Sequence, residues 1–278
     1  MKIIVSHLSP DIDSITSIWL IKKFYPGWQN AQLKFVNAGQ TLNNQPPDDN
    51  PDIIHVDTGC GKFDHHQTKD YTSATEKVFN FLLKNNFINN KYLPALKRMI
   101  KQINDFDHFA EVNFPQSTAD YFEFLISQII DGGLKSVYKN DEEIVKAVLP
   151  FLDGVFQVFI KKIKAETDIK NGYIFQSYWG KSIVIQSKNE EAVKFAIKSG
   201  YQLVARKDSE KKGIRIKINP NSKKTLKKLY QKIINIDKKA TWFYHISGKM
   251  LLNFSSKNPN FLPSKLSLKE LIEIIKSV

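Results

Sequence analysis

The sequence predicts an α/β protein with two domains: an N-terminal parallel-sheet domain with helices on both faces, and a smaller C-terminal α/β domain with a mainly antiparallel sheet. Three observations predict this fold. The chain has 278 residues, 42% hydrophobic and 25% charged, which suits two globular domains of roughly 100 to 150 residues each. Over the first 57 residues, β-branched runs alternate with an amphipathic segment, as in a βαβ unit. After residue 171, strand-like runs follow one another closely, which favours antiparallel pairing.

Apolar patterning places the first elements. The run "KIIVS" is expected to form a buried strand that ends at His7, and a helix is expected over Ser14–Tyr25. A second strand is expected to begin near Leu33, and a third to cover Asp52–Asp57. In parallel sheets, ligands bind beyond the carboxyl ends of the strands. His7 and Asp57 stand at such ends, so we expect the functional site there.

The remaining elements divide at a polar stretch before Asn171-Gly172. Helices are expected near 75–86, 93–107, 117–130 and 141–166, then strands at 172–179, 181–187, 201–207 and 213–219, with helices near 190–199, 222–235 and 267–276. We therefore expect a catalytic, metal-binding domain with a helical extension at 1–168 and a basic substrate-binding domain at 169–278.

Charge and cysteine content narrow the classes of function. Residues 1–130 carry 12 Lys and Arg against 14 Asp and Glu, whereas residues 131–278 carry 29 against 14. The basic second half predicts a polyanionic partner such as nucleic acid, although solubility alone could also explain it. The single cysteine, Cys60, excludes an intramolecular disulfide and favours a reducing cytoplasm. No apolar run reaches the roughly 18 residues of a membrane span.

The loop "HLSPDID" supplies the first candidate ligands, His7, Asp11 and Asp13. Its spacing lets nitrogen and oxygen donors converge from one turn at a strand end. The alternative is ordinary turn chemistry, in which Asp13 or Ser14 caps the helix that follows.

Two further acidic segments follow. In "HVDTGCGKFDHHQ", Asp57 ends a buried strand and is followed by Asp64, His65 and His66. A carboxylate placed there needs a cation or hydrogen bonds. In "INDFDHF", acidic side chains end a helix, where they oppose the helix dipole. Asp107 is the favoured ligand there, with Asp105 as its competitor.

Together these segments predict two metal centres that share a carboxylate. Their donors are mostly oxygen with some imidazole nitrogen, which favours Mn²⁺ or Mg²⁺ and permits Fe²⁺, Co²⁺ or Zn²⁺. Two such ions suit the hydrolysis of a phosphoester.

The four motifs, in this order over about the first 110 residues, resemble those of the DHH phosphoesterase superfamily. The resemblance implies a DHH-type fold for the N-terminal domain and two divalent ions, with Mn²⁺ the expected metal. It implies that one ion is held by His7, Asp11 and Asp57, and the other by Asp13, Asp57, His65 and Asp107. It also implies that His66 faces the substrate phosphate and that Asp64 orients its neighbours.

The C-terminal half has no GGGH-type motif and no SRKKQ-like motif. Its segment "TWFYHISGKMLLNFSSKNPN" is similar to a stretch of the melanocyte-proliferating-gene exonuclease branch of the superfamily. That similarity implies substrate binding by His245, Ser247, Gly248, Asn253, Ser255 and Lys257. The alternative is a polar turn between a strand and the last helix.

The resulting prediction is a metal-dependent phosphodiester hydrolase, an exonuclease acting on single-stranded RNA or DNA or on short oligonucleotides. One alternative is a phosphoesterase for a nucleotide, a cyclic dinucleotide or pyrophosphate. Another is a non-catalytic nucleic-acid-binding module that keeps the metals. A nucleic acid or oligonucleotide is the expected partner, a homodimer is left open, and no membrane partner is expected.

Overall fold

The computed structural model describes residues 1–253 and 260–278. The chain divides into two compact units, Met1–Ile160 and Lys161–Val278. The division lies within helix α6 (Asp141–Lys170), as does the boundary expected at 168–169. Among the described residues, no helix combines the length and the apolarity that crossing a membrane requires.

The first unit is built on a parallel sheet of strands β1 (Ile3–His7), β2 (Gln32–Val36) and β3 (Ile53–His55), in the order β2-β1-β3. Ile4 lies opposite Leu33 on one side and Ile54 on the other. Neighbouring side chains of a strand point to opposite faces, and Ile4 and Val5 are both fully buried, so both faces of β1 are covered. The βαβ rhythm of the sequence is confirmed.

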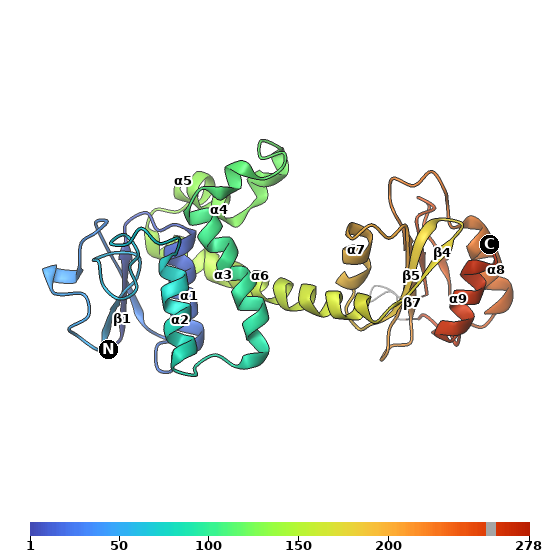
Figure 1. The fold of residues 1–278 in the computed structure, drawn as a ribbon, viewed down its shortest axis with the longest axis horizontal. Coiled ribbons are helices and arrows are strands. Elements are labelled where there is room, and N and C mark those ends of the chain that lie inside the picture. The colour runs from blue at the N-terminus through green and yellow to red at the C-terminus, as the bar shows by residue number, and fades with distance from the viewer. Residues whose placement is uncertain (254–259) are drawn as a thin grey trace. The chain divides into compact units, whose positions relative to one another are not determined.

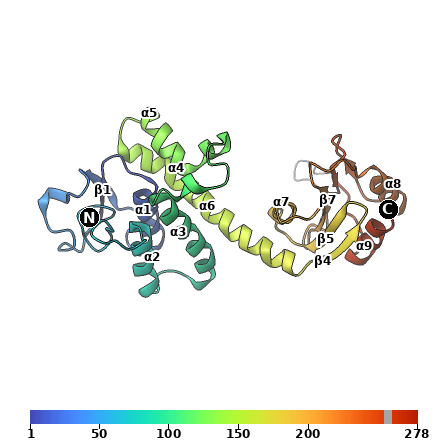
Figure 2. The same cartoon turned by 45° about the horizontal axis from the view of Figure 1, so that its top comes forward.

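Three helices pack beside this sheet. Helices α1 (Ile12–Phe24), α2 (Ala74–Lys84) and α3 (Leu93–Asp107) contact one another and lie on the same side of β1 in both views (Figures 1 and 2). Helix α1 starts earlier than expected because Asp11 is its N-cap, with the carboxylate accepting the N–H of Ser14 at 2.9 Å. The alternative in which Asp13 or Ser14 caps this helix is therefore wrong.

The segment after α3 differs from the single helix expected at 117–130. Between α3 and α6 the chain forms five short pieces of different helix types. Those after α3 are the 3-10 turns Ala110–Asn113 and Asp120–Phe124, α4 (Ile126–Gln128), a π-helical turn Ile129–Leu134 and α5 (Lys135–Val137). Leu125 adopts an extended conformation with ψ of 141°, which interrupts the helix before α4. Two further 3-10 turns, Leu42–Asn44 and Asn90–Tyr92, lie in earlier loops.

The second unit holds a six-stranded sheet in the order β4-β5-β6-β7-β9-β8. Only β5 and β6 pair in parallel; the other neighbours are antiparallel. The strands are β4 (Tyr173–Ser177), β5 (Gly180–Gln186), β6 (Leu203–Lys207), β7 (Ile214–Ile218), β8 (Phe243–Tyr244) and β9 (Met250–Leu252). The helices are α7 (Glu191–Lys198), α8 (Lys227–Ile236) and α9 (Leu268–Lys276). The predicted α/β class, with a parallel sheet followed by a mainly antiparallel one, is confirmed.

Helices cover the two faces of this second sheet separately. Ile183 and Val204 pack with Val193 of α7 on one face, whereas Leu203 and Ile216 belong to the core formed with α8 and α9. Figure 1 shows α7 on one side of β5 and β7 and the other two helices on the opposite side.

Candidate metal centre

Asp57 stands at the centre of the predicted site. It follows β3 by two residues, its side chain is buried, and its backbone is left-handed with φ of 55°. One carboxylate oxygen, Oδ2, lies 3.2 Å from Nε2 of His7, and the other, Oδ1, lies 3.3 Å from Nε2 of His65. The two oxygens of one carboxylate therefore face two different histidines.

His7, Asp11 and Asp57 form the first group of converging donors, with one ligand atom from each within 4.8 Å of the others. His7 ends β1, and its Nδ1 lies 2.8 Å from the Leu8 carbonyl, to which it donates. That bond leaves Nε2 as the nitrogen available to a metal. Asp11 uses Oδ1 for the helix cap, so Oδ2, which is 3.9 Å from Nε2 of His7, stays free.

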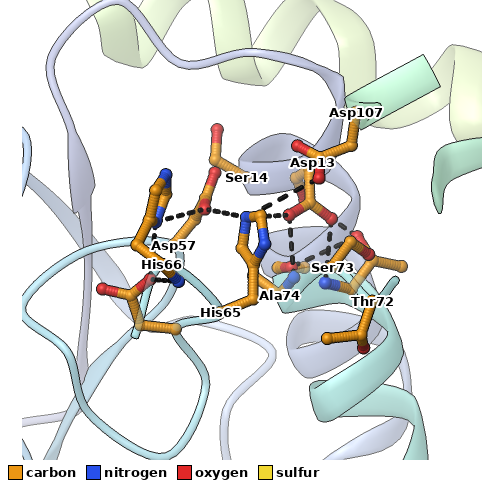
Figure 3. A network of polar contacts seen from close by, with 12 residues as sticks. Asp13, Ser14, Asp57, His65, His66, Thr72, Ser73, Ala74 and Asp107 are labelled. Atoms are coloured by element: carbon orange, nitrogen blue, oxygen red, sulfur yellow. Dashed lines mark hydrogen bonds and ion pairs between the residues drawn. The ribbon is translucent and has the colours of Figure 1, made fainter. Parts of the chain in front are cut away.

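Asp13, His65 and Asp107 form the second group. Nε2 of His65 lies 3.8 Å from Asp13 and 3.7 Å from Asp107 (Figure 3). The Asp13 side chain has no exposed surface and accepts the backbone N–H groups of Ala74 at 2.8 Å and Thr75 at 2.9 Å. The first turn of α2 therefore fixes Asp13 from behind, and its amides offset only part of the effect of burial on this carboxyl group.

Asp64 and His66 lie on the other side of Asp57. Buried Asp64 accepts the backbone N–H groups of Cys60 at 2.7 Å and of His66 at 3.1 Å. Nδ1 of His66 lies 2.7 Å from the same carboxylate, while the His66 side chain is 62% exposed. Nδ1 is thus occupied and Nε2 is left toward solvent. Asp57, His65 and His66 also converge as a third group.

The structure separates the two candidates at the end of α3. Asp105 is occupied, since it accepts Tyr71 at 2.9 Å, Lys101 at 2.8 Å and Gln102 at 2.9 Å. Asp107 instead faces His65. The geometry favours Asp107 as the donor.

The crowding of carboxylates and histidines shifts their protonation. Burial, together with the charges of Asp57 and Asp107, raises the pKa of Asp13 to about 8. Burial also raises the pKa of Asp107 to about 6. The close approach of the Asp57 carboxylate, 3.3 Å from Nε2, raises the pKa of His65 to about 9. Burial alone would lower the pKa of His7, but its bond to Asp57 outweighs this effect and raises the pKa to about 9.

These residues fit divalent ions. Oδ1 of Asp57 and Nε2 of His65 are buried and lack a hydrogen-bond partner, because their mutual approach at 3.3 Å has poor hydrogen-bond geometry. Buried polar atoms without partners are costly, so a bound cation is a natural explanation. The donors are carboxylate oxygens and imidazole nitrogens, which suit Mn²⁺, Mg²⁺ or Co²⁺.

A pocket of about 320 Å³ opens at these residues, and Ala38, Gly39 and the exposed Cys60 contribute to its lining. Sequence patterns did not reveal the supporting network behind it. Ser73, the N-cap of α2, donates to Asn104 at 2.7 Å, and Asn104 donates to Glu76 at 2.6 Å. The sequence feature that could have indicated this network is the position of Asn104, one helical turn before Asp107 in the same motif.

In the second unit, those predicted substrate residues that the structure describes do not converge. His245, Ser247 and Gly248 form the turn between β8 and β9, where the N–H of Gly248 donates to the His245 carbonyl at 2.8 Å. Gly248 has φ of 71°, and a Cβ there would lie 3.0 Å from Thr225 and Tyr244. The glycine is needed for close packing in this turn.

Asn253 lies at the opposite end of β9 from that turn. It is buried, donates to the carbonyls of Thr241 and Leu262 at 2.9 and 3.0 Å, and accepts the N–H of Ser264 at 2.7 Å. In this position its side chain holds neighbouring loops together and has no free donor for a substrate. Ser255 and Lys257 lie outside the described residues.

Three comparisons relate the chain to known proteins. No curated protein matches it. A solved structure described as the DHH domain of a member of a family of ribosomal proteins has a TM-score of 0.31 and 14% sequence identity, covering 99% of this chain and 86% of that chain. That likeness is too distant to carry an argument. Residues 5–159 match the family model described as ChrB, C-terminal domain. Because this match spans more than half of the sequence, the chain belongs to the ChrB C-terminal domain family.

Proposed function

We propose that the chain is a metal-dependent phosphodiester hydrolase of the DHH type. The observation that carries this proposal is the position of Asp57, whose two oxygens face His7 and His65 at 3.2 and 3.3 Å. A carboxylate between two donor groups suits a pair of divalent ions, and such pairs serve phosphoester hydrolysis.

The two groups would hold one ion each. Their proposed ligands are His7, Asp11 and Asp57 for the first ion, and Asp13, Asp57, His65 and Asp107 for the second. Divalent ions held there, with Mn²⁺ expected first, would activate water and neutralise the charge that develops on the phosphoryl oxygens.

His66 and Asp64 would handle the substrate. Burial alone would raise the pKa of Asp64, but hydrogen bonds from His66 and from the Cys60 backbone outweigh this effect and lower the pKa, so the carboxylate stays ionised. It fixes Nδ1 of His66 and leaves Nε2 free. In its doubly protonated form, His66 can donate from that atom a hydrogen bond to a phosphate oxygen or a proton to the leaving oxygen.

We propose single-stranded RNA or DNA, or short oligonucleotides, as the substrate and exonucleolytic cleavage as the activity. The charge of the second unit supports a polyanion, because residues 161–278 carry 26 Lys and Arg against 9 Asp and Glu. The free thiol of Cys60 suits the reducing cytoplasm in which such a substrate would be met.

A substrate screen with Mn²⁺ tests the proposal. The probes are a short RNA, a short single-stranded DNA, a cyclic dinucleotide, pyrophosphate and the chromogenic diester bis(p-nitrophenyl) phosphate. We expect hydrolysis of diesters that stops after chelation. Turnover of pyrophosphate alone would favour a small-molecule enzyme, and metal binding without any turnover would favour a non-catalytic module.

A further inference from the structure

Four connections meet at one end of the sheet in the second unit. The indole N–H of Trp179 donates to the Thr225 carbonyl at 3.2 Å, and the N–H of Leu226 donates to the Gly248 carbonyl at 2.8 Å. The N–H of Gln202 donates to the Lys181 carbonyl at 2.7 Å. These bonds join the segments 177–181, 198–202, 219–228 and 245–249, which together are called the acid-free end.

This end carries many cations and no carboxylate side chains. Its seven lysines are Lys181, Lys198, Lys223, Lys224, Lys227, Lys228 and Lys249. Neither aspartate nor glutamate occurs in its four segments. The asymmetry continues along helix α8, since residues 219–236 contain five lysines and no acidic residue. Such a cluster creates a positive potential that attracts anions.

The lysines of the acid-free end are held without countercharges. Lys224 donates to the Tyr178 carbonyl and lies 4.3 Å from the centre of the Tyr178 ring. Lys249 donates to the carbonyls of Ser222 and Lys224. Across 1–253 and 260–278, no ion pair joins any of the seven lysines to a carboxylate. Their positive charge is therefore available to a partner.

The opposite end of the same sheet is different. There Lys188 pairs with Glu210, Arg206 lies 3.3 Å from Asp208, and Arg215 lies 2.9 Å from Glu190. Both ends belong to the same lysine-rich domain and are subject to the same bias of composition. A general bias of composition toward lysine would affect both ends alike, so it does not explain why carboxylates accompany the cations at one end only.

We infer that the acid-free end binds the phosphate backbone of a single-stranded nucleic acid. This inference rests on the proposed function and gives it a location in the second unit. Phosphates would take the place of the missing carboxylates beside the lysines. Tyr178, which is 51% exposed, offers a face on which a base can stack. The turn that holds His245 and Ser247 is part of this end and supplies further donors.

The test measures binding of a fluorescein-labelled 12-nucleotide oligothymidylate in chelator, from 50 to 200 mM KCl. The variant is Lys223→Glu/Lys227→Glu, which reverses two exposed charges. We expect the dissociation constant at 50 mM to rise at least about tenfold, and the salt slope to fall by about 1.4 because each single-strand phosphate contact contributes about 0.7. An unchanged slope and dissociation constant would overturn the inference.

The matched control is Lys211→Glu/Lys212→Glu, which reverses two exposed charges at the opposite end. We expect its dissociation constant to stay within about twofold of the wild type, since that end is not in contact with the strand. Equal losses in both variants would also overturn the inference, because attraction would then depend on net charge alone. Circular dichroism melting of both variants checks that they fold.

Two further measurements separate the competing explanations. Vesicles containing phosphatidylserine replace the oligonucleotide in a sedimentation assay; binding to vesicles but not to the oligonucleotide would overturn the inference in favour of a lipid surface. Manganese-dependent hydrolysis of bis(p-nitrophenyl) phosphate by the wild type tests the proposed function separately. If the wild type hydrolyses the diester but the charge reversals do not change oligonucleotide binding, only the inference is overturned. If the charge reversals weaken oligonucleotide binding but no diester is hydrolysed, only the proposed function is overturned.

Discussion

The candidate metal centre is rich in buried acidic side chains, whereas the acid-free end is rich in exposed lysines. In the metal centre, the carboxyl groups of Asp13, Asp57 and Asp64 are buried and each accepts specific hydrogen bonds. At the acid-free end, lysines such as Lys223 and Lys227 are exposed and form no ion pair with a carboxylate of the described part of the chain. Removing one partner of a buried charged group costs several kcal/mol, whereas each exposed charge contributes little and many of them act together. Single substitutions should therefore have large effects in the first region and small ones in the second.

The largest effect is expected from Asp57→Asn. Asparagine keeps the shape of the side chain and tolerates the left-handed backbone at φ of 55°, but one of its two donor oxygens becomes a neutral amide. We expect kcat/KM for Mn²⁺-dependent hydrolysis to fall about 10³-fold, which corresponds to about 4 kcal/mol. The control is Asp70→Asn, which changes an exposed aspartate of the same loop region. Activity within tenfold of the wild type in folded Asp57→Asn would contradict the shared carboxylate.

The second effect is a steep pH dependence of metal binding. His7 and His65 have pKa values raised to about 9 and Asp13 to about 8, so each tends to hold a proton at pH 7 that a metal must displace. We expect the apparent affinity for Mn²⁺ to rise about tenfold per displaced proton for each pH unit between 6 and 8. Calorimetric titration at pH 6, 7 and 8 measures it.

The stability of the metal-free protein should change in the opposite direction. Groups whose pKa is higher in the folded state bind more protons there, so their contribution falls as the pH rises toward 8 or 9. The increase in melting temperature caused by Mn²⁺ should therefore be larger at pH 8 than at pH 6. An increase that is the same at both pH values would show that these groups are not the ligands.

Local sequence was sufficient to predict the donors that stand at strand ends. His7 ends β1 and Asp57 follows β3, so the parallel register alone brings them to one edge. The resemblance to the DHH superfamily implied different roles for His65 and His66; His65 lies 3.3 Å from Asp57, whereas His66 lies 2.7 Å from Asp64. The support behind Asp13 could not be read in this way, because Ala74 and Thr75 lie more than 60 residues away and reach it only through the packing of α2 on α1.

The third effect concerns that packing. Asn104 joins Ser73 to Glu76 at the start of α2, whose amides hold Asp13. We expect Asn104→Leu to raise the dissociation constant for Mn²⁺ about tenfold or more, since residues that orient metal ligands carry such effects. Calorimetric stoichiometry and the electron paramagnetic resonance spectrum of the Mn²⁺ pair report this change separately from folding.

A matched control lies at the other end of the same helix. Asn85 is the C-cap of α2, and its side chain donates to the Phe81 carbonyl at 2.8 Å. Asn85→Leu should lower stability and leave the Mn²⁺ stoichiometry and spectrum unchanged. If both leucine variants lose metal equally, Asn104 has only a general role in folding.

The C-terminal sheet was harder to predict than the N-terminal site. β9 covers only three residues, and its place between β7 and β8 depends on pairing with Arg215–Lys217, which lie far from it in sequence. Once β9 is placed, the predicted substrate residues His245 and Asn253 fall on opposite ends of it. Spacing in the sequence therefore suggested a convergence that strand geometry does not provide.

The smallest effect on activity is expected from Asn253→Ala. Removing this buried side chain breaks its three hydrogen bonds to the backbone groups of Thr241, Leu262 and Ser264, so we expect a stability loss of about 3 kcal/mol. Thermal melting measures it, with Asn221→Ala as an exposed control. Hydrolysis of a short single strand, per mole of folded protein, should stay within about twofold of the wild type, because a side chain whose donors and acceptor already bond the protein has none left for phosphate. A tenfold loss of activity without a loss of stability would support substrate binding by Asn253 and would require the loops around it to open.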